Sequence, residues 1–305
     1  MLVRSINMYL VQPGLVKPDQ KTATQSVVTQ LDQQRGGAAA ALAATAPLAA
    51  IASLPPPLKV FVYANEHKPA FQLLYDSLQA RGYEVKLLGQ GQPWRGFAER
   101  MRVYQAAAAA EPPDSLVAFL DGYDTLALLP ASAAVEKFLA RPRAALPILF
   151  SAEPVCLTNC DKGQLAWFDS HPTKLGSAAA IRAALKPVPD RPAAEGSVLH
   201  SADAPVFLNG GAVMGRAGPL AAFYAAALAT GDFDDQRALG KILTTSEAGK
   251  GVDLDVEGSV FRTKVAAAAA KAADEGSPTG PAFLHFPGMY GKEGELLQRM
   301  RQYGS

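Results

Sequence analysis

The regular alternation of strand-like and helix-like segments that begins at Leu58 is the strongest constraint on this chain. Residues 58–63, LKVFVY, are rich in β-branched and aromatic side chains and predict a buried strand. Residues 69–82 have apolar side chains at helical spacing and end in Gly82, which predicts a helix and its stop. Residues 83–89, YEVKLLG, predict a second strand. This βαβ order predicts parallel strands joined by a right-handed crossover.

The alternation continues beyond the second strand. It predicts a helix near residues 97–110, a strand at 115–120, a helix near 132–139 and a strand at 147–153. We therefore predict an α/β fold with a mostly parallel central sheet. Ligands of such sheets bind beyond the carboxyl ends of the strands, so we expect functional residues where the strands end.

Composition narrows the class of partner. The chain has 305 residues, 49% of them hydrophobic, and its 29 Lys and Arg nearly balance its 28 Asp and Glu. This balance argues against a polybasic protein that binds nucleic acid. The two cysteines, Cys156 and Cys160, have no second pair or His cluster to complete a zinc site. A local disulfide and two reduced thiols are both open.

Residues 1–57 differ from the rest, because mixed polar residues lead into an Ala- and Pro-rich stretch. We predict a disordered N-terminal tail there and one folded domain over residues 58–305. The Ala-rich run at residues 38–54 has roughly the length of a membrane span. Ala is only weakly apolar, however, and Thr45 and Pro47 interrupt the run. A membrane anchor or a transit-like signal is the alternative to disorder.

Two aspartates follow the third predicted strand. In SLVAFLDGYD, Asp121 falls where the strand ends and Asp124 comes three positions later. Asp-Gly between apolar runs is a hairpin signal, with TLALL as the return strand. The two carboxylates are also hard oxygen ligands for a divalent ion, which suits a diphosphate. A turn and a metal site are both open.

Three further segments carry candidate site residues. GDFDDQ places Asp234 and Asp235 before a helical run, where one aspartate can cap the helix and a carboxylate can serve catalysis. FLNGG contains Asn209 before two glycines that a tight turn alone would explain. PWRGFAERMR contains Trp94 and Arg100 after the second strand, where a guanidinium can face either a diphosphate or solvent.

Six segments, in this order, resemble the glycosyltransferase domain of the procollagen-lysine hydroxylases and its stand-alone relatives. They are LGQGQPWRG, FLDGYDTLAL, ILFSAEPVC, FLNGGAVMG, DDQ at residues 234–236 and LHFPGMYGK, and they span most of residues 58–292. The resemblance implies a GT-A-like fold and transfer of glucose or galactose from a UDP-sugar with manganese or another divalent ion. It implies a hydroxyl acceptor on a glycan or hydroxylysine, and a place in the secretory pathway, in the endoplasmic reticulum or Golgi.

The resemblance also implies a role for each candidate. Asp121, Asp124 and His285 would hold the metal; Asp234, Asp235 and Asn209 would serve the transfer; Asn65, Trp94, Arg100, Tyr123, Gly288 and Lys292 would contact the nucleotide. The chain departs from the family where Phe286 and Pro287 follow His285 in place of glycine and asparagine. It also lacks the family's glycine-rich turn and lysine near residues 97–100, where Arg100 is the substitute. His285 alone would equally suit the end of a half-buried strand.

Two other functions remain open at this point. A GT-A-like shell can hold a nucleotide or glycan without turnover, which the altered histidine loop would permit. A metal-dependent hydrolase can instead cleave a nucleotide sugar. Release of UDP with and without an acceptor distinguishes these functions from a transferase.

Overall fold

The computed structural model describes residues 58–156, 162–187, 199–201, 204–264, 276–288 and 292–304. The predicted tail with its Ala-rich run, and Cys160, lie outside these residues. The tail, the anchor and the state of the two cysteines therefore stay predictions, as does the domain boundary. No helix in the described ranges is both long enough and apolar enough to cross a membrane.

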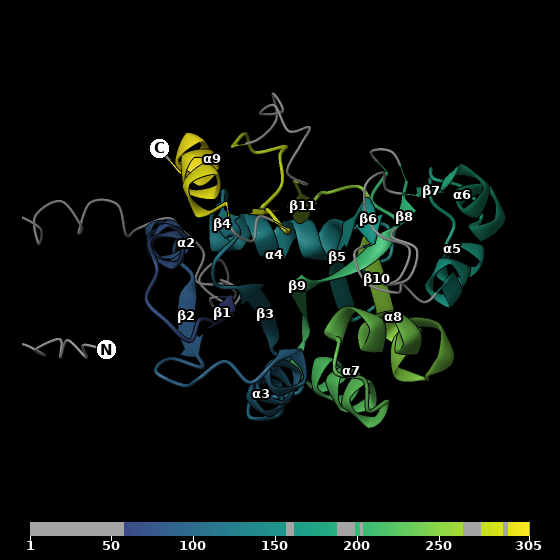
Figure 1. Cartoon of the computed structure of the whole chain (residues 1–305), viewed down its shortest axis with the longest axis horizontal. Helices are drawn as coiled ribbons and strands as arrows, with labels where there is room; N and C mark the ends of the chain where they lie inside the picture. The colour runs from purple at the N-terminus through teal and green to yellow at the C-terminus, as the bar shows by residue number, and fades with distance from the viewer. Residues whose placement is uncertain are drawn as a thin grey trace, which may run out of the picture. The chain divides into compact units, whose positions relative to one another are not determined.

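A six-stranded sheet forms the centre of the domain, in the order β10-β5-β9-β3-β1-β2 (Figure 1). The strands are β1 (Lys59–Tyr63), β2 (Glu84–Leu88), β3 (Leu116–Asp121), β5 (Ile148–Glu153), β9 (Phe207–Arg216) and β10 (Val252–Asp255). β1 pairs parallel with β2 and β3, and β10 pairs parallel with β5, whereas β9 is antiparallel to both of its neighbours. The predicted α/β class with a mostly parallel sheet is confirmed.

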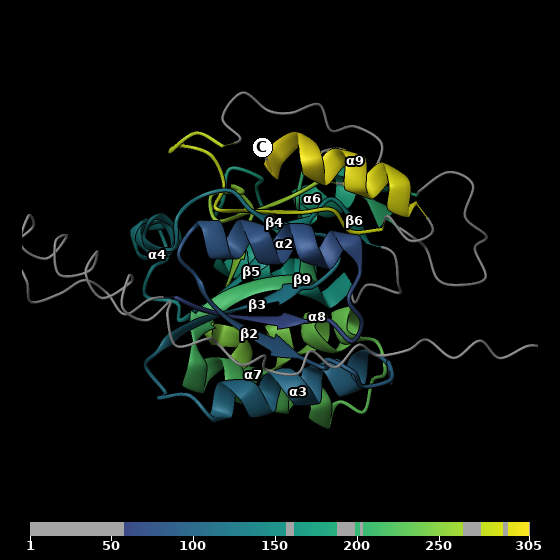
Figure 2. The same ribbon diagram turned by 90° about the vertical axis from the view of Figure 1, so that its left-hand side faces the viewer.

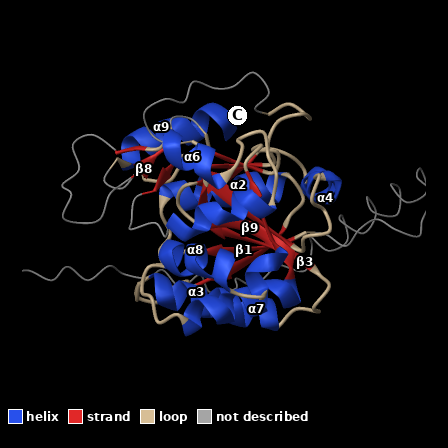
Figure 3. Cartoon of the chain, turned by 90° about the vertical axis from the view of Figure 1, so that its right-hand side faces the viewer, coloured by secondary structure: helices blue, strands red, loops and turns tan. Residues whose placement is uncertain are grey.

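Helices cover both faces of this sheet (Figures 2 and 3). They are α3 (Phe97–Ala109), α7 (Ala217–Ala229) and α8 (Asp235–Thr245) on one face, and α2 (Pro69–Ala80) and α4 (Ala131–Ala140) on the other. Successive side chains of one strand enter opposite cores: Phe61 packs with the first group, and Val60 and Val62 with the second. Burial on both faces explains why the strands read as continuous apolar runs.

A smaller sheet, in the order β11-β12-β4, packs against the second core. Its strands are β4 (Thr125–Ala127), β11 (Phe261–Thr263) and β12 (Phe283–His285), and α9 (Glu293–Gly304) covers its outer side. β4 pairs with β12 and not with β3. The hairpin interpretation of Asp121 and Gly122 is therefore wrong, because the chain leaves one sheet there and enters another.

The remaining elements are short. They are β6 (Val155–Cys156), β7 (Lys186–Pro187) and β8 (Leu199–His200), which form a third small sheet, and the helices η2 (Lys162–Ala166), α5 (Trp167–Ser170), α6 (Ala178–Ala184) and η4 (Ala248–Gly251). The parallel strands β1, β3, β5 and β10 end at one edge of the central sheet, and the antiparallel β9 begins at that edge. That edge holds the candidate residues.

Candidate functional site

Strand ends bring most of the candidate residues together. β3 ends at Asp121, and β9 begins beside it with Asn209 and Gly211. In the smaller sheet, His285 pairs with Thr125, the residue after Asp124. The candidate site therefore lies beyond the carboxyl ends of the parallel strands, as predicted.

Asp121, Asp124 and His285 converge at this edge. One potential ligand atom from each lies within 4.8 Å of those from the other two. Nε2 of His285 is 3.3 Å from Oδ1 of Asp124, yet both of these buried atoms, and Nδ1 of His285, lack a hydrogen-bond partner among the described residues. Buried polar atoms without partners are rare and costly. The unpartnered atoms of Asp124 and His285, together with the nearby carboxylate of Asp121, fit a divalent cation such as Mn²⁺.

The backbone of β9 leaves room for this set at Gly211. A β-carbon there would lie 2.3 Å from Cε1 and 2.7 Å from Nε2 of His285, and 2.9 Å from Oδ2 of Asp121. A β-carbon at this position would therefore displace His285 or Asp121 from the candidate metal site. Gly210 and Gly211 both lie within β9, so the tight-turn interpretation of these glycines is wrong.

Arg100 reaches from α3 into the same edge. Its Nη1 donates a hydrogen bond to Oδ1 of Asp121, and its Nη2 donates one to Oδ2 of Asp235. The guanidinium also lies over the rings of Phe97 and Tyr104. The interpretation that an arginine here faces solvent therefore holds for Arg102, whose side chain is 62% exposed. It does not hold for Arg100, whose side chain is 8% exposed.

The pKa values of Asp121 and His285 are both raised in this cluster. Burial raises the pKa of Asp121 to about 6, against the lowering effect of Arg100 and with a further rise from Asp124. Burial alone would lower the pKa of His285, but Asp124, Asp121 and Glu153 outweigh burial and raise it. Burial of the carboxyl group dominates the shift of Asp121 and nearby carboxylates cause that of His285, and a bound cation would favour the ionised carboxylates.

The two aspartates before α8 occupy different positions. Asp234 is the N-cap residue, and its Oδ1 accepts a hydrogen bond from the backbone N–H of Arg237 at 2.9 Å. Asp235 is buried, and its carboxylate meets Arg100 and the backbone N–H of Gln236. Helix capping therefore accounts for Asp234 and leaves Asp235 to be explained.

A hollow of about 360 Å³ opens beside the cluster. It is lined by Tyr63, Asn65, Glu66, Lys68, Trp94, Phe97, Arg100, Asp121, Gly122, Tyr123 and Asp124. Trp94 is 46% exposed, with its ring edge-on to Tyr63 and Phe97. The hydroxyl of Tyr123 donates to Oδ1 of Asn65 and accepts from the backbone N–H of Glu66, both at 2.9 Å. Four residues predicted to contact a nucleotide thus share one hollow next to the candidate metal ligands.

Gly288, Lys292 and Asn209 are also absent from the lining of this hollow. Gly288 and Lys292 are exposed, on either side of residues 289–291, which are outside the described ranges. Asn209 is buried, and its Oδ1 accepts hydrogen bonds from the hydroxyl of Ser151 and the backbone N–H of Gly211. The roles predicted for Gly288, Lys292 and Asn209 stay predictions.

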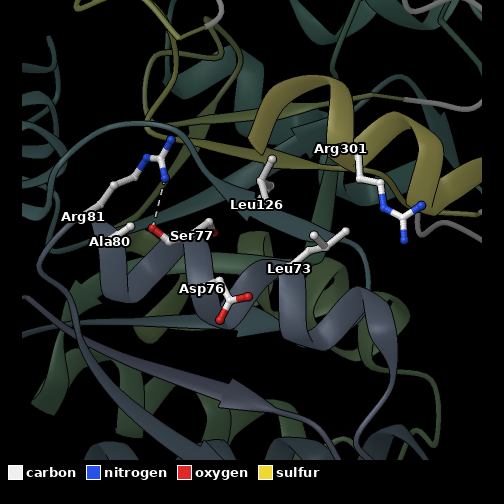
Figure 4. Close-up of a pocket in the computed structure, with 7 residues that line it drawn as sticks. All are labelled: Leu73, Asp76, Ser77, Ala80, Arg81, Leu126 and Arg301. Carbon is white, nitrogen blue, oxygen red and sulfur yellow. Dashed lines mark hydrogen bonds between the residues drawn. The ribbon is translucent and has the colours of Figure 1, made fainter. Parts of the chain in front are cut away.

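Figure 4 shows a second hollow, of about 470 Å³, lined by residues of α2, β4 and α9 and by Arg81. Its apolar lining comes from Leu73, Ala80 and Leu126, and Arg81 donates a hydrogen bond to the backbone carbonyl of Ser77. This hollow shares no lining residue with the first and contains none of the predicted site residues.

Comparison with protein-family models supports the resemblance that the sequence motifs indicated. Residues 55–163 match the family model for the PLOD GT domain. The resemblance to that glycosyltransferase domain is confirmed over this stretch, which contains Asp121, Asp124 and all residues lining the hollow. Asp235 and His285 lie beyond the matched stretch, and the fold brings them next to Arg100, Asp121 and Asp124. The match supports a glycosyltransferase.

Comparison with solved structures found a glycosyltransferase involved in the glycosylation of the major capsid of PBCV-1. The similarity covers 81% of this chain and 100% of that chain, at 11% sequence identity and a TM-score of 0.46. This similarity is too low to indicate a function. No curated protein matched.

Glu153 is a site residue that the sequence analysis did not single out. It ends β5, is 2% exposed and accepts hydrogen bonds from the side chains of Asn209 and Gln236, the latter at 2.6 Å. Burial raises its pKa from 4.5 to about 7. A buried carboxyl with a raised pKa at the ligand edge is typical of functional sites. The available signal was its position at the end of the predicted strand ILFSAE.

Replacing Glu153 with Gln should change how stability depends on pH. Between pH 4.5 and about 7 the folded protein keeps a proton on Glu153 that the unfolded chain releases. The free energy of unfolding therefore falls as pH rises through that window. The Glu153→Gln variant should match the wild type near pH 4.5 and exceed it by roughly 3 kcal/mol at pH 8.

Urea unfolding of both proteins in EDTA, at several pH values, measures this difference. Glu66→Gln is the control for the same change of side chain at an exposed position. Parallel curves for Glu153→Gln and the wild type would contradict the raised pKa of Glu153.

Proposed function

We propose that this chain is a divalent-metal-dependent glycosyltransferase that moves a hexose, glucose or galactose, from a UDP-sugar to a hydroxyl acceptor. The observation that carries this proposal is the convergence of Asp121, Asp124 and His285 beside the hollow, where buried atoms of Asp124 and His285 lack hydrogen-bond partners among the described residues. A divalent ion at these residues would stabilise the diphosphate leaving group. The likeness to the PLOD GT domain favours UDP as the nucleotide and the secretory pathway, in the endoplasmic reticulum or Golgi, as the location.

The hollow supports the donor half of this proposal. Trp94 offers a partly exposed indole on which a base can stack. Tyr123 ties Asn65 and Glu66, after β1, to the turn after β3, so the loop that would meet the nucleoside is held in place. Asp121 and Asp124 belong to the same lining, so a diphosphate in the hollow would meet the candidate metal ligands.

Asp235 supports the part of the proposal that concerns the acceptor. Its carboxylate lies across the Arg100 guanidinium from Asp121, at the start of α8. In the proposed reaction Asp235 orients the acceptor hydroxyl, takes its proton or stabilises positive charge on the sugar. The acceptor hydroxyl belongs to a glycan or to a hydroxylysine-type side chain.

Release of UDP tests the proposal against its alternatives. The purified protein is incubated with Mn²⁺ and UDP-glucose or UDP-galactose, with and without glycan and hydroxylysine acceptors, and free UDP is measured. A transferase releases UDP faster when an acceptor is present. Equal release with and without acceptor would indicate a nucleotide-sugar hydrolase, and no release with tight binding would indicate a binding module.

Replacing Asp124 with Ala should remove most of the metal-dependent UDP affinity. The carboxylate is expected in the first coordination shell, and the other two ligands alone hold a cation poorly. Calorimetric titration of UDP with Mn²⁺ should show binding by the wild type, and EDTA should weaken it. Asp76→Ala is the control, since Asp76 lines the second hollow. Equal UDP affinity in Mn²⁺ and in EDTA would contradict the metal assignment.

Replacing Asp235 and Asp234 separately with Asn should give different results. Asn caps a helix about as well as Asp, so Asp234→Asn should change stability by only a few tenths of a kcal/mol and leave transfer intact. Asp235→Asn keeps an oxygen for Arg100 but loses the negative charge and the ability to take a proton. Transfer should fall roughly a hundredfold, about 2.7 kcal/mol in the barrier.

Turnover, UDP affinity and melting temperature are measured for both variants. UDP affinity should stay within a few-fold of the wild type. Near wild-type turnover by Asp235→Asn would remove Asp235 from the catalytic residues.

A further inference from the structure

Arg100 links two residues that have separate tasks in the proposed function. We propose that Arg100 is a positioning residue of the metal centre. Its guanidinium holds Asp121 so that one carboxylate oxygen faces the cation position, and it fixes that centre relative to Asp235 on α8. This inference rests on the proposed function, because it takes Asp121 as a metal ligand.

The two oxygens of Asp121 point to different neighbours. Oδ1 accepts the hydrogen bond from Nη1 of Arg100. Oδ2 lies on the side of His285, because a β-carbon at Gly211 would be 2.9 Å from Oδ2 and 2.7 Å from Nε2 of His285. The carboxylate thus has one oxygen held by the protein and the other directed toward the remaining ligands. Hydrogen bonds of this kind orient metal-binding carboxylates.

The second contact of Arg100 anchors it. Nη2 donates to Oδ2 of Asp235, whose Oδ1 accepts from the backbone N–H of Gln236 at 2.9 Å, so the start of α8 holds this carboxylate. The side chains of Arg100 and Asp235 are each 8% exposed, so water screens the pair little. The planar fork of an arginine can meet two carboxylates at once, which the single ammonium of a lysine does poorly.

This geometry gives Arg100 a different role from the nucleotide contact that the sequence suggested. Two of its guanidinium nitrogens, Nη1 and Nη2, already contact carboxylates. A diphosphate would have to compete with Asp121 and Asp235 for them. Arg100 acts on the donor through the metal ligand, and its loss should lower metal affinity even without a nucleotide.

Binding of Mn²⁺ alone tests this inference. Free Mn²⁺ is measured by electron paramagnetic resonance for the wild type, Arg100→Met, Arg100→Lys and Arg102→Met, with no nucleotide or acceptor. We expect Arg100→Met to bind Mn²⁺ roughly 10- to 100-fold more weakly, and Arg100→Lys about tenfold more weakly. Arg102→Met should bind as the wild type does, because Arg102 lies on the same helix but its side chain is 62% exposed and pairs with Glu99 among the described residues.

Melting temperatures separate positioning from folding. Arg100→Met leaves two acidic side chains without their cation and can unfold, whereas Arg100→Lys keeps the charge, so Arg100→Lys decides the result if Arg100→Met does not fold. Folded Arg100→Lys with wild-type or tighter Mn²⁺ affinity would overturn the inference. So would weaker UDP binding at saturating Mn²⁺ with unchanged Mn²⁺ affinity, which would make Arg100 a diphosphate contact. If the wild type itself binds no Mn²⁺, the proposed function fails, and the inference fails with it.

Discussion

Burial of several acidic side chains at one edge of the sheet is the constraint on which the rest of the site depends. Asp121, Asp124, Glu153 and Asp235 contribute carboxyl groups to this edge, and burial raises the pKa of Asp121 and Glu153. Arg100 balances part of this charge through its contacts with Asp121 and Asp235. The balance is incomplete, and a divalent ion is the group that would complete it.

The topology of the sheet creates this concentration of charge. Parallel strands end side by side, so Asp121 after β3 and Glu153 after β5 reach the same edge. The antiparallel β9 begins between them and presents Gly211, whose missing side chain leaves space for His285 from the smaller sheet.

In the proposed function, the donor side and the acceptor side of the site come from different parts of the chain. The stretch matching the PLOD GT domain, residues 55–163, supplies the hollow, Asp121 and Asp124. His285 and Asp235 come from later segments, and they meet the first part through the candidate metal centre and through Arg100. The buried guanidinium of Arg100 would thus connect the residues that bind the nucleotide sugar with the residue that acts on the acceptor.

Local patterns in the sequence were sufficient for the order of strands and helices between residues 58 and 153 apart from β4, since periodicity and turn residues act over a few positions. They also located Asp121 at a strand end. They did not decide between a hairpin and a metal site, because pairing of β4 with β12 joins segments far apart in the sequence. The antiparallel course of β9, the separate positions of Asp234 and Asp235, and the two contacts of Arg100 likewise came only from the tertiary structure. Each of these features depends on contacts between buried groups that are far apart in the sequence. A short stretch of sequence does not contain that information.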